Sequence, residues 1–221
     1  MNLPLLEPTP IPARLHVIWV GSAPPDWVKQ RWDAWNQRAL LDGWEMWVWT
    51  DETVNELLPL SSVLKSHCPH PAIYSDFIRI EAVSVYGGVY IDSDTWPLNP
   101  LTSLAGDTFP WVSSDTIKSG KPQVTNAAFA SPPGSRLLSR VWEIAIDRLA
   151  TRQFDLIHYY AGPVVWAQAV NELSTLVIVL PPEAFSPLPW RARRRGIPKA
   201  VADLPAFAAE HLGSYALHEY E

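Results

Sequence analysis

The sequence predicts a single α/β domain with a mostly parallel central sheet flanked by helices. Its 221 residues are 48% hydrophobic and 18% charged, which suits one globular unit with a continuous core. Apolar runs of strand length alternate with segments of helical period along the chain. We find no internal repeat and no linker, so residues 1–221 are assigned to one domain.

Four elements are predicted in the first quarter of the chain. The apolar run Leu15–Gly21 ends in glycine, as is typical of a buried strand that leads into a loop. Residues Pro25–Leu41 place tryptophan and valine at helical spacing, and Trp44–Asp51 alternates like a second strand. Asp51–Leu58 begins a short helix. We expect the first of these strands to be central in the sheet.

The next predicted helix begins at Pro71 and ends at Gly87, because proline suits a first helical turn and glycine a helix stop. An apolar stripe runs along it, and Asp76 and Arg79, three residues apart, share a neighbouring face. Gly88–Asp92 follows as an apolar strand. The rest of the chain continues the alternation. Its predicted strands are Pro110–Ser114, Asn126–Ser131 and Leu176–Leu180, and its helices span Ser135–Leu149 and start at the Gly162-Pro163 turn.

Composition excludes several classes of function. A net charge of −6 and a pI near 5.5 give no overall positive field toward nucleic acid or anionic lipid. Cys68 is the only cysteine, which excludes an internal disulfide and fits a reducing cytoplasm. The first residues do not resemble a signal peptide, and no apolar run reaches the roughly 20 residues that span a bilayer. We therefore expect a cytoplasmic protein whose membrane contact, if any, is peripheral.

The segment with the most chemical information is SDFIRIEAVSVYGGVYIDSDTWP, residues 75–97. Asp92 and Asp94 stand at the end of an apolar strand, on one side of it if the extended conformation persists. Two such carboxylates suit a hard divalent cation, Mn²⁺ or Mg²⁺, which in turn can hold a diphosphate. Asp76 and Arg79 offer an acceptor and a fork of donors that suit sugar hydroxyls. A bare D-x-D most often only decorates a turn, but here a strand, a double glycine and an Asp/Arg helix accompany it.

These residues resemble the glycosyltransferases with a DXD sugar-binding region, family 32, whose core is shared with glucosylating bacterial toxins. The signature S-D-x-x-R followed by G-G-x-Y-x-D-x-D and proline extends here from Ser75 to Pro97. Weaker similarities lie at IPARLHVIWVG, TNAAFAS, YYAGP and LPPEAFSPL. The resemblance implies a GT-A fold, a UDP- or GDP-linked sugar donor, transfer to a glycan or other hydroxyl acceptor, and retention of anomeric configuration.

The resemblance also implies roles for individual residues. It places the catalytic functions on Asp76, Arg79, Asp92 and Asp94, with the first two holding the transferred sugar. Trp19 would stack on the nucleobase, and the donor would further contact four residues, Tyr90, Asp92, Asn126 and Gly162. Asp94, Asp92 and His218 would hold the metal. Two departures stand out, since Ala161 replaces the family's threonine, and the chain stops at Glu221 without the family's Ser-Trp pair.

Three other classes of protein use carboxylates in a similar pattern. A haloacid dehalogenase-type phosphatase would use Asp92 as nucleophile, but its threonine stands four residues after that aspartate, whereas Thr95 is three after Asp92. A glycoside hydrolase would need carboxylates on opposite faces of the bond. The chain would be a non-catalytic sugar-nucleotide-binding module if the short C-terminus left the metal site incomplete.

Three further features receive simpler interpretations. Most of the twelve tryptophans, including Trp32, Trp35 and Trp47, have core-like spacing, which leaves Trp19, Trp96 and Trp190 as platform candidates. His67, Cys68 and His70 lack the ligand spacing of a zinc site. The basic run Arg191–Lys199 is a solvated loop or an arm for phosphates, and it is the sole support for a modified DNA base as acceptor.

Overall fold

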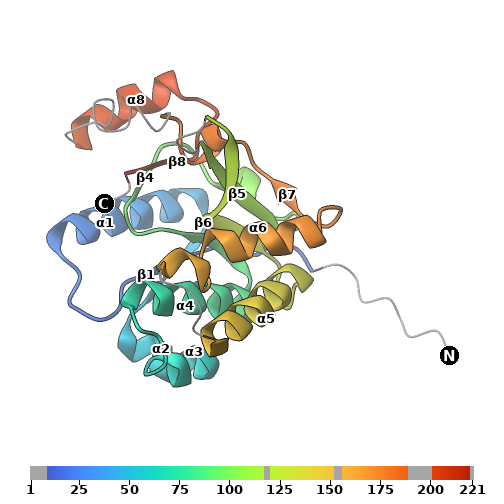
Figure 1. Cartoon of the computed structure of the whole chain (residues 1–221). Helices are drawn as coiled ribbons and strands as arrows, with labels where there is room; N and C mark the ends of the chain where they lie inside the picture. The colour runs from blue at the N-terminus through green and yellow to red at the C-terminus, as the bar shows by residue number, and fades with distance from the viewer. Residues whose placement is uncertain (1–8, 117–119, 152–155, 189–200, 220–221) are drawn as a thin grey trace.

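The computed structural model describes residues 9–116, 120–151, 156–188 and 201–219. Within these ranges a six-stranded sheet lies between two groups of helices, and a two-stranded sheet lies beside it (Figure 1). The strands are β1 Arg14–Ile18, β2 Glu45–Trp49, β3 Gly88–Ile91, β4 Thr95–Pro97, β5 Trp111–Thr116, β6 Pro122–Ser131, β7 Ile178–Val179 and β8 Ala216–His218. The helices are α1 Asp26–Asp42, α2 Asp51–Leu57, α3 Pro59–Leu64, α4 Pro71–Tyr86, α5 Arg136–Thr151, α6 Pro163–Glu172 and α8 Leu204–Glu210.

The large sheet has the strand order β2-β1-β3-β6-β5-β7. β1 pairs in parallel with β2 and β3, and β5 pairs in parallel with β7. β6 is antiparallel to both of its neighbours, so in this sheet it runs against the other five strands. The predicted mostly parallel α/β sheet is therefore confirmed, and β1 is an interior strand as expected.

Alternation along the strands builds two separate hydrophobic layers. On β3, Tyr90 faces the layer formed with α2, α4, α5 and α6, whereas Val89 and Ile91 belong to the layer covered by α1. On β6, Phe129 and Ala128 divide between the same two layers. Helices thus cover both faces of the sheet (Figure 1). Each helix in the described ranges is too short or too polar to cross a membrane.

The predicted double-glycine break between α4 and β3 has a steric cause. Gly87 ends α4 at a φ of 63°, and a Cβ there would lie 2.7 Å from the Pro133 ring and 2.8 Å from the Pro12 ring. Gly88 has a φ of 114°, and a Cβ there would lie 2.5 Å from the Arg14 carbonyl oxygen. Both positions therefore need glycine, because α4 must turn sharply to place β3 against β1.

The predicted elements are present with shifted ends, and four others are not predicted by the sequence pattern. β6 begins at Pro122 rather than Asn126. The additional elements are α3, α8 and the two short strands β4 and β8, which pair antiparallel with Trp96 opposite Leu217. This small sheet matters for function, because it brings the end of the described chain to the segment that follows β3.

Candidate active site

The two aspartates of the D-x-D motif lie in a turn between β3 and β4. The extended conformation does not persist through them, contrary to the condition under which alternation would place them on one side. The Thr95 hydroxyl donates to the Asp92 carbonyl at 2.7 Å, and the Ser93 hydroxyl donates to the Ile18 carbonyl at 2.8 Å. These bonds hold the turn against the end of β1, so Asp92 and Asp94 converge through the turn rather than through strand alternation.

His218 completes a group of three potential metal ligands, which we call the DXD–histidine cluster (Asp92, Asp94 and His218). Its ligand atoms lie within 4.8 Å of one another, and within the described ranges it is the one such group of three or more. The His218 Nε2 atom lies 3.1 Å from Asp94 Oδ1 and 3.7 Å from Asp92 Oδ2. β8 delivers this histidine, because His218 pairs with Thr95 of β4.

The chemistry of this cluster fits a hard divalent cation. Two carboxylates and one imidazole suit Mn²⁺ or Mg²⁺, whereas a zinc site of the structural type would use cysteine. Burial lowers the pKa of His218, but the Asp94 carboxylate, with Asp92 and Asp115, raises it above its ordinary value overall. The imidazole is thus embedded in negative charge that a cation would neutralise.

Behind the cluster lies a set of hydrogen-bonded residues, which we call the Arg79 network (Asp76, Arg79, Tyr90, Asp92 and Asn126). All of them are buried except Asp92, whose side chain is 24% exposed. Arg79 Nη1 donates to Asp92 Oδ1 at 2.9 Å and to the Asn126 carbonyl at 3.0 Å, and its Nη2 lies 3.3 Å from Asp76 Oδ1. The Tyr90 hydroxyl donates to Asp92 Oδ1 at 2.7 Å, and the Asn126 amide donates to Asp76 Oδ1 at 2.7 Å. The guanidinium also lies over the Tyr90 ring, 4.5 Å from its centroid.

Burial raises the pKa values of the two carboxyl groups in this network. It raises the pKa of Asp76 to about 6, although the Arg79 guanidinium opposes the shift. Burial likewise raises the pKa of Asp92, with Arg79 opposing and Asp94 adding to it. Burial acts against the charge of Arg79, but Tyr90 and the acids around it raise its pKa overall. A buried carboxyl with such a pKa marks a candidate functional site.

A cavity of about 550 Å³ opens beside both groups. Trp19 lies at its edge, half-buried, with its ring in an edge-to-face contact with Trp27 at 5.6 Å between centroids. Arg79, Asp92 and Asp94 reach the same cavity. The lining residues are Ile18, Trp19, Val20, Gly21, Ser22, Trp27, His70, Pro71, Ala72, Ser75, Arg79, Tyr90, Asp92, Ser93 and Asp94. A half-buried aromatic ring and two potential metal ligands in one cavity would suit a nucleotide with its phosphates.

The structure brings most of the predicted site residues together, but Gly162 is separate. Asp76 and Asn126 stand behind Arg79 and do not line the cavity. Both contact the Arg79 guanidinium, which does line it: Nη2 lies 3.3 Å from Asp76 Oδ1, and Nη1 donates to the Asn126 carbonyl at 3.0 Å. Gly162 is the N-cap of α6, where a Cβ would lie 2.9 Å from the His158 backbone, and it is not part of the cavity lining. Its predicted donor contact remains a prediction. Trp190 and the basic run Arg191–Lys199 lie outside the described residues.

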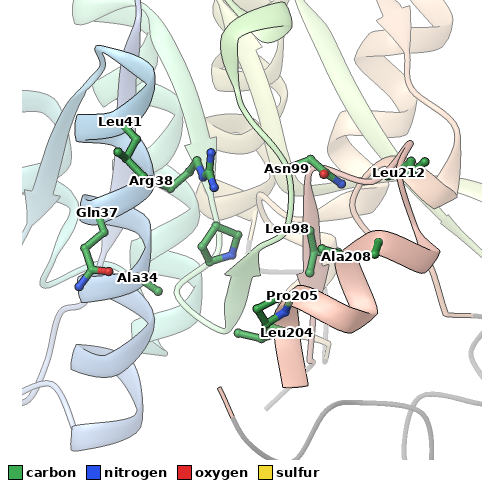
Figure 2. Close-up of a pocket in the computed structure, with 12 residues that line it drawn as sticks. Ala34, Gln37, Arg38, Leu41, Leu98, Asn99, Leu204, Pro205, Ala208 and Leu212 are labelled. Atoms are coloured by element: carbon green, nitrogen blue, oxygen red, sulfur yellow. The ribbon is translucent and has the colours of Figure 1, made fainter. Parts of the chain in front are cut away.

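A second cavity, of about 490 Å³, lies between α1 and α8. Figure 2 shows side chains of α1 facing those of α8 across Leu98 and Asn99. Among the described residues that line this cavity there is no carboxylate and no histidine. Of these two cavities, the first is therefore the one with acid, base or ligand groups among its described lining residues.

Some residues near the site are not predicted to be functional from sequence. Trp32, assigned to packing, donates its Nε1–H to the Ser93 hydroxyl at 3.1 Å and so supports the D-x-D turn. Asp115, near the end of β5, contributes to the negative field at His218. Trp96, in contrast, is a platform candidate from the sequence, but it is buried under Arg31, whose guanidinium lies 4.9 Å from the ring centroid, and it does not line the cavity. Asp115 directly follows the strand predicted over Pro110–Ser114, and a polar residue at the end of an apolar strand is the sequence signal that could have identified it.

Comparison with known proteins agrees with this geometry. Residues 26–111 match the family described as a glycosyltransferase sugar-binding region containing a DXD motif. That range includes Asp94 and every member of the Arg79 network except Asn126. No curated protein matches the sequence.

The fold is similar to those of several solved glycosyltransferases. The PaToxG glycosyltransferase superposes with a TM-score of 0.59 at 14% identity, over 95% of this chain and 90% of that one. The UDP-bound glycosyltransferase domain of the YGT toxin has a TM-score of 0.51 at 13% identity, over 78% and 80%. A glycosyltransferase involved in glycosylation of the major capsid of PBCV-1 has a TM-score of 0.52 at 13% identity, over 95% and 96%.

Proposed function

We propose that this chain, a glycosyltransferase by its DXD region and its GT-A fold, transfers a hexose from a nucleoside-diphosphate sugar to a hydroxyl acceptor. UDP is the nucleotide we favour, because the UDP-bound YGT toxin domain shares the fold. One observation carries the proposal most directly. The DXD–histidine cluster stands at the edge of a cavity that also contains an aromatic platform and the Arg79 guanidinium.

The reaction requires a leaving diphosphate to be neutralised without strong acid. A divalent cation held by Asp92, Asp94 and His218 would supply that neutralising charge, and Mn²⁺ is our first choice over Mg²⁺. Trp19 would support the nucleobase, since its half-buried ring lines the cavity.

The Arg79 network would orient both the metal edge and the sugar. Arg79 and Tyr90 both donate to the same oxygen of Asp92, which leaves its other oxygen, Oδ2, on the His218 side. Asp76 stands behind Arg79, but its side chain keeps 11% exposure, so its carboxylate would accept a hydrogen bond from a sugar hydroxyl that also contacts the guanidinium. The Asn126 amide would hold that carboxylate in place.

We further propose retention of anomeric configuration and a glycan or other hydroxyl acceptor, on the strength of the family resemblance. We also propose that residues 1–221 act as one domain, since His218 completes a cluster begun by Asp92 and Asp94. The single cysteine, Cys68, supports a reducing compartment such as the cytoplasm.

A donor-hydrolysis assay tests this proposal. Purified protein is incubated with UDP-hexoses and GDP-hexoses, with Mn²⁺ or with excess chelator, and free nucleoside diphosphate is measured. We expect UDP release that depends on the metal, and a rise in thermal stability with UDP and Mn²⁺ together. Release of inorganic phosphate, or UDP release that persists in chelator, would contradict the transferase mechanism. Proton NMR of the released sugar then reports the anomeric outcome.

A further inference from the structure

Arg31 occupies a position in α1 where an apolar residue is expected. It lies on the buried stripe of the helix, with Val28, Trp35 and Ala39, and is 6% exposed. A charged side chain in such a stripe is costly unless it is paired. The sequence spacing of α1 therefore does not by itself account for an arginine here.

The partner of Arg31 comes from the other end of the chain. Its Nε donates to Glu219 Oε2 at 2.6 Å, its Nη2 contacts the same carboxylate oxygen, and the two residues are 188 positions apart in sequence. The guanidinium is enclosed by the rings of Trp27 and Trp96, with centroids 4.8 Å and 4.9 Å away. Its Nη1 donates to the Trp27 carbonyl at 2.7 Å. The Glu219 side chain is 10% exposed, so the pair is largely removed from water.

Glu219 directly follows His218, and both residues are tied to the D-x-D turn. The backbone N–H of Glu219 donates to the Asp94 carbonyl at 3.0 Å. β8 and β4 have three residues each, and an isolated two-stranded pair of this kind is marginally stable in water. α1 already supports β4, because the Trp35 Nε1–H donates to Thr95 at 3.0 Å. β8 has its corresponding attachment to α1 in the Arg31–Glu219 pair.

We propose that Arg31 is a positioning residue that holds His218 at the metal site by anchoring Glu219. The inference rests on the proposed function, since it concerns the same metal. Arg31 does not contact the ligand atoms itself, and its role is to fix the short strand that delivers one of them. Trp27 contacts both the Arg31 guanidinium and the Trp19 ring. The Arg31–Glu219 pair therefore also connects residues 216–219 to the wall of the cavity that Trp19 and Trp27 line.

The test measures Mn²⁺ affinity by electron paramagnetic resonance, with and without UDP. For Arg31→Met we expect affinity about tenfold weaker, in the range found when outer-shell partners of metal ligands are removed. The opposite sign is expected if Arg31 acts only through its charge, because removing a positive group near the site would tighten Mn²⁺ binding. Unchanged or tighter binding by Arg31→Met would overturn the proposal.

A matched control and a double-mutant cycle separate positioning from general damage. Arg140 donates from its Nε to Glu172 Oε2 at 2.6 Å in an exposed pair, so Arg140→Met makes the same substitution away from the site and should leave the affinity unchanged. In a His218→Ala background, Arg31→Met should cause no further loss, because the ligand that it positions is already gone. A second full tenfold loss in that background would show that Arg31 acts on the site without His218.

Amide hydrogen exchange in the absence of metal makes the test independent of the proposed function. Arg31→Met should speed exchange at Leu217 and Glu219 relative to wild type and to Arg140→Met. Equal exchange would overturn the anchoring role even if Mn²⁺ bound. Wild-type protein that binds no Mn²⁺, but whose tail loosens in Arg31→Met, would instead contradict the metal site and leave the anchor intact. If Arg31→Met fails to fold, Arg31→Lys is measured, which keeps the charge and loses the fork; it should bind Mn²⁺ more weakly than wild type.

Discussion

Two groups of buried polar side chains adjoin β1 and β3, and they satisfy their hydrogen bonds in different ways. The first, which we call the His16 cluster, contains His16, Trp47, Trp49 and Tyr86. The Nε2–H of His16 donates to the Gly87 carbonyl at 2.8 Å, and its Nδ1 accepts from the Trp49 Nε1–H at 3.0 Å. Both ring nitrogens are satisfied, and burial lowers the pKa of His16 to about 4. This histidine is neutral and structural.

The second group, the Arg79 network, contains formal charges. Its carboxylates are paired with a single guanidinium, and its pKa values are shifted upward for Asp76 and Asp92. His16 and Tyr90 are register partners across β1 and β3, so the two groups are adjacent in the sheet. The difference shows that burial alone does not mark a functional site. Charges that remain buried beside a cavity, with acids converging at its edge, are the distinguishing feature.

The largest expected effect is at Asp94. Asp94→Ala should lower UDP release by about 10³-fold or more, because a metal's share of transition-state stabilisation is several kcal/mol. Circular dichroism should show an unchanged fold, since Asp94 lies in a turn at the edge of the cavity. Turnover close to that of wild type would exclude Asp94 as an essential ligand. Asp92→Asn should also impair turnover, though less, and His218→Ala should weaken donor binding with Mn²⁺.

The second expected effect is on stability and concerns the His16 cluster. The folded pKa of His16, about 4, is lower than its ordinary value of 6.5, so the unfolded chain binds more protons between these two values. The stability from the neutral imidazole is therefore complete above pH 6.5 and is lost as the pH falls toward 4. At roughly 1.4 kcal/mol per unit, this histidine contributes about 3 kcal/mol to the pH dependence.

Urea unfolding in chelator, at several pH values, measures this effect. His16→Gln should be less stable at pH 7 because it packs less well against Trp49, but its free energy of unfolding should fall less between pH 6.5 and 4. A variant with the same slope as wild type would show that other groups cause the acid sensitivity.

Residues close together in sequence were the predictable part of this molecule. The helix with Asp76 and Arg79, the double glycine and the strand that ends at Asp92 all follow from local spacing, and the structure contains each of them. The approximate order of strands and helices follows from hydrophobic period, because each strand divides its side chains between two layers. The ends of helices and strands were less predictable, because ends fray and depend on capping geometry, which the hydrophobic period does not report.

Long-range pairings of short elements could not be predicted in the same way. Three-residue strands such as β4 and β8 are too short to show a period, and nothing local indicates that Arg31 pairs with Glu219. The turn through Ser93 depends on a bond to the Ile18 carbonyl of another strand. The family resemblance predicts His218 as a metal ligand, whereas its proximity to Asp94 and Asp92 and its pairing through β8 are seen only in the structure.

The third prediction tests whether charge in the Arg79 network serves function at the expense of stability. Asp76→Asn should lower turnover by about 10²-fold, because a sugar contact that tightens in the transition state would be weakened, while UDP affinity changes little. Arg79→Ala should reduce turnover similarly. An equal loss of UDP affinity would move these residues to the diphosphate.

The same Asp76→Asn variant should be more stable than wild type at pH 7. The folded pKa of Asp76, about 6, is above its ordinary value of 3.8, so its contribution to stability is complete below pH 3.8 and is lost as the pH rises through 6. Asparagine does not ionise, so the variant should keep at pH 7 the part of the free energy of unfolding that the wild type loses when Asp76 ionises. A variant that is both less active and less stable would argue against this account of the network.

The smallest expected effect compares two half-buried tryptophans, one from each region. Trp19 lines the cavity of the candidate active site, whereas Trp47 packs beside His16 and under the Arg14 guanidinium, 4.2 Å from its ring centroid. Trp19→Ala should weaken UDP binding about tenfold, near the lower end of the effect of removing a ring that stacks on a base. Trp47→Ala should leave UDP affinity unchanged and lower the free energy of unfolding by about 2 kcal/mol, because it removes packing from a partly buried site. Calorimetric titration with UDP and Mn²⁺, paired with urea unfolding, measures both quantities. If the two variants lost UDP affinity equally, Trp19 would be acting through the fold, and the proposed base platform would be wrong.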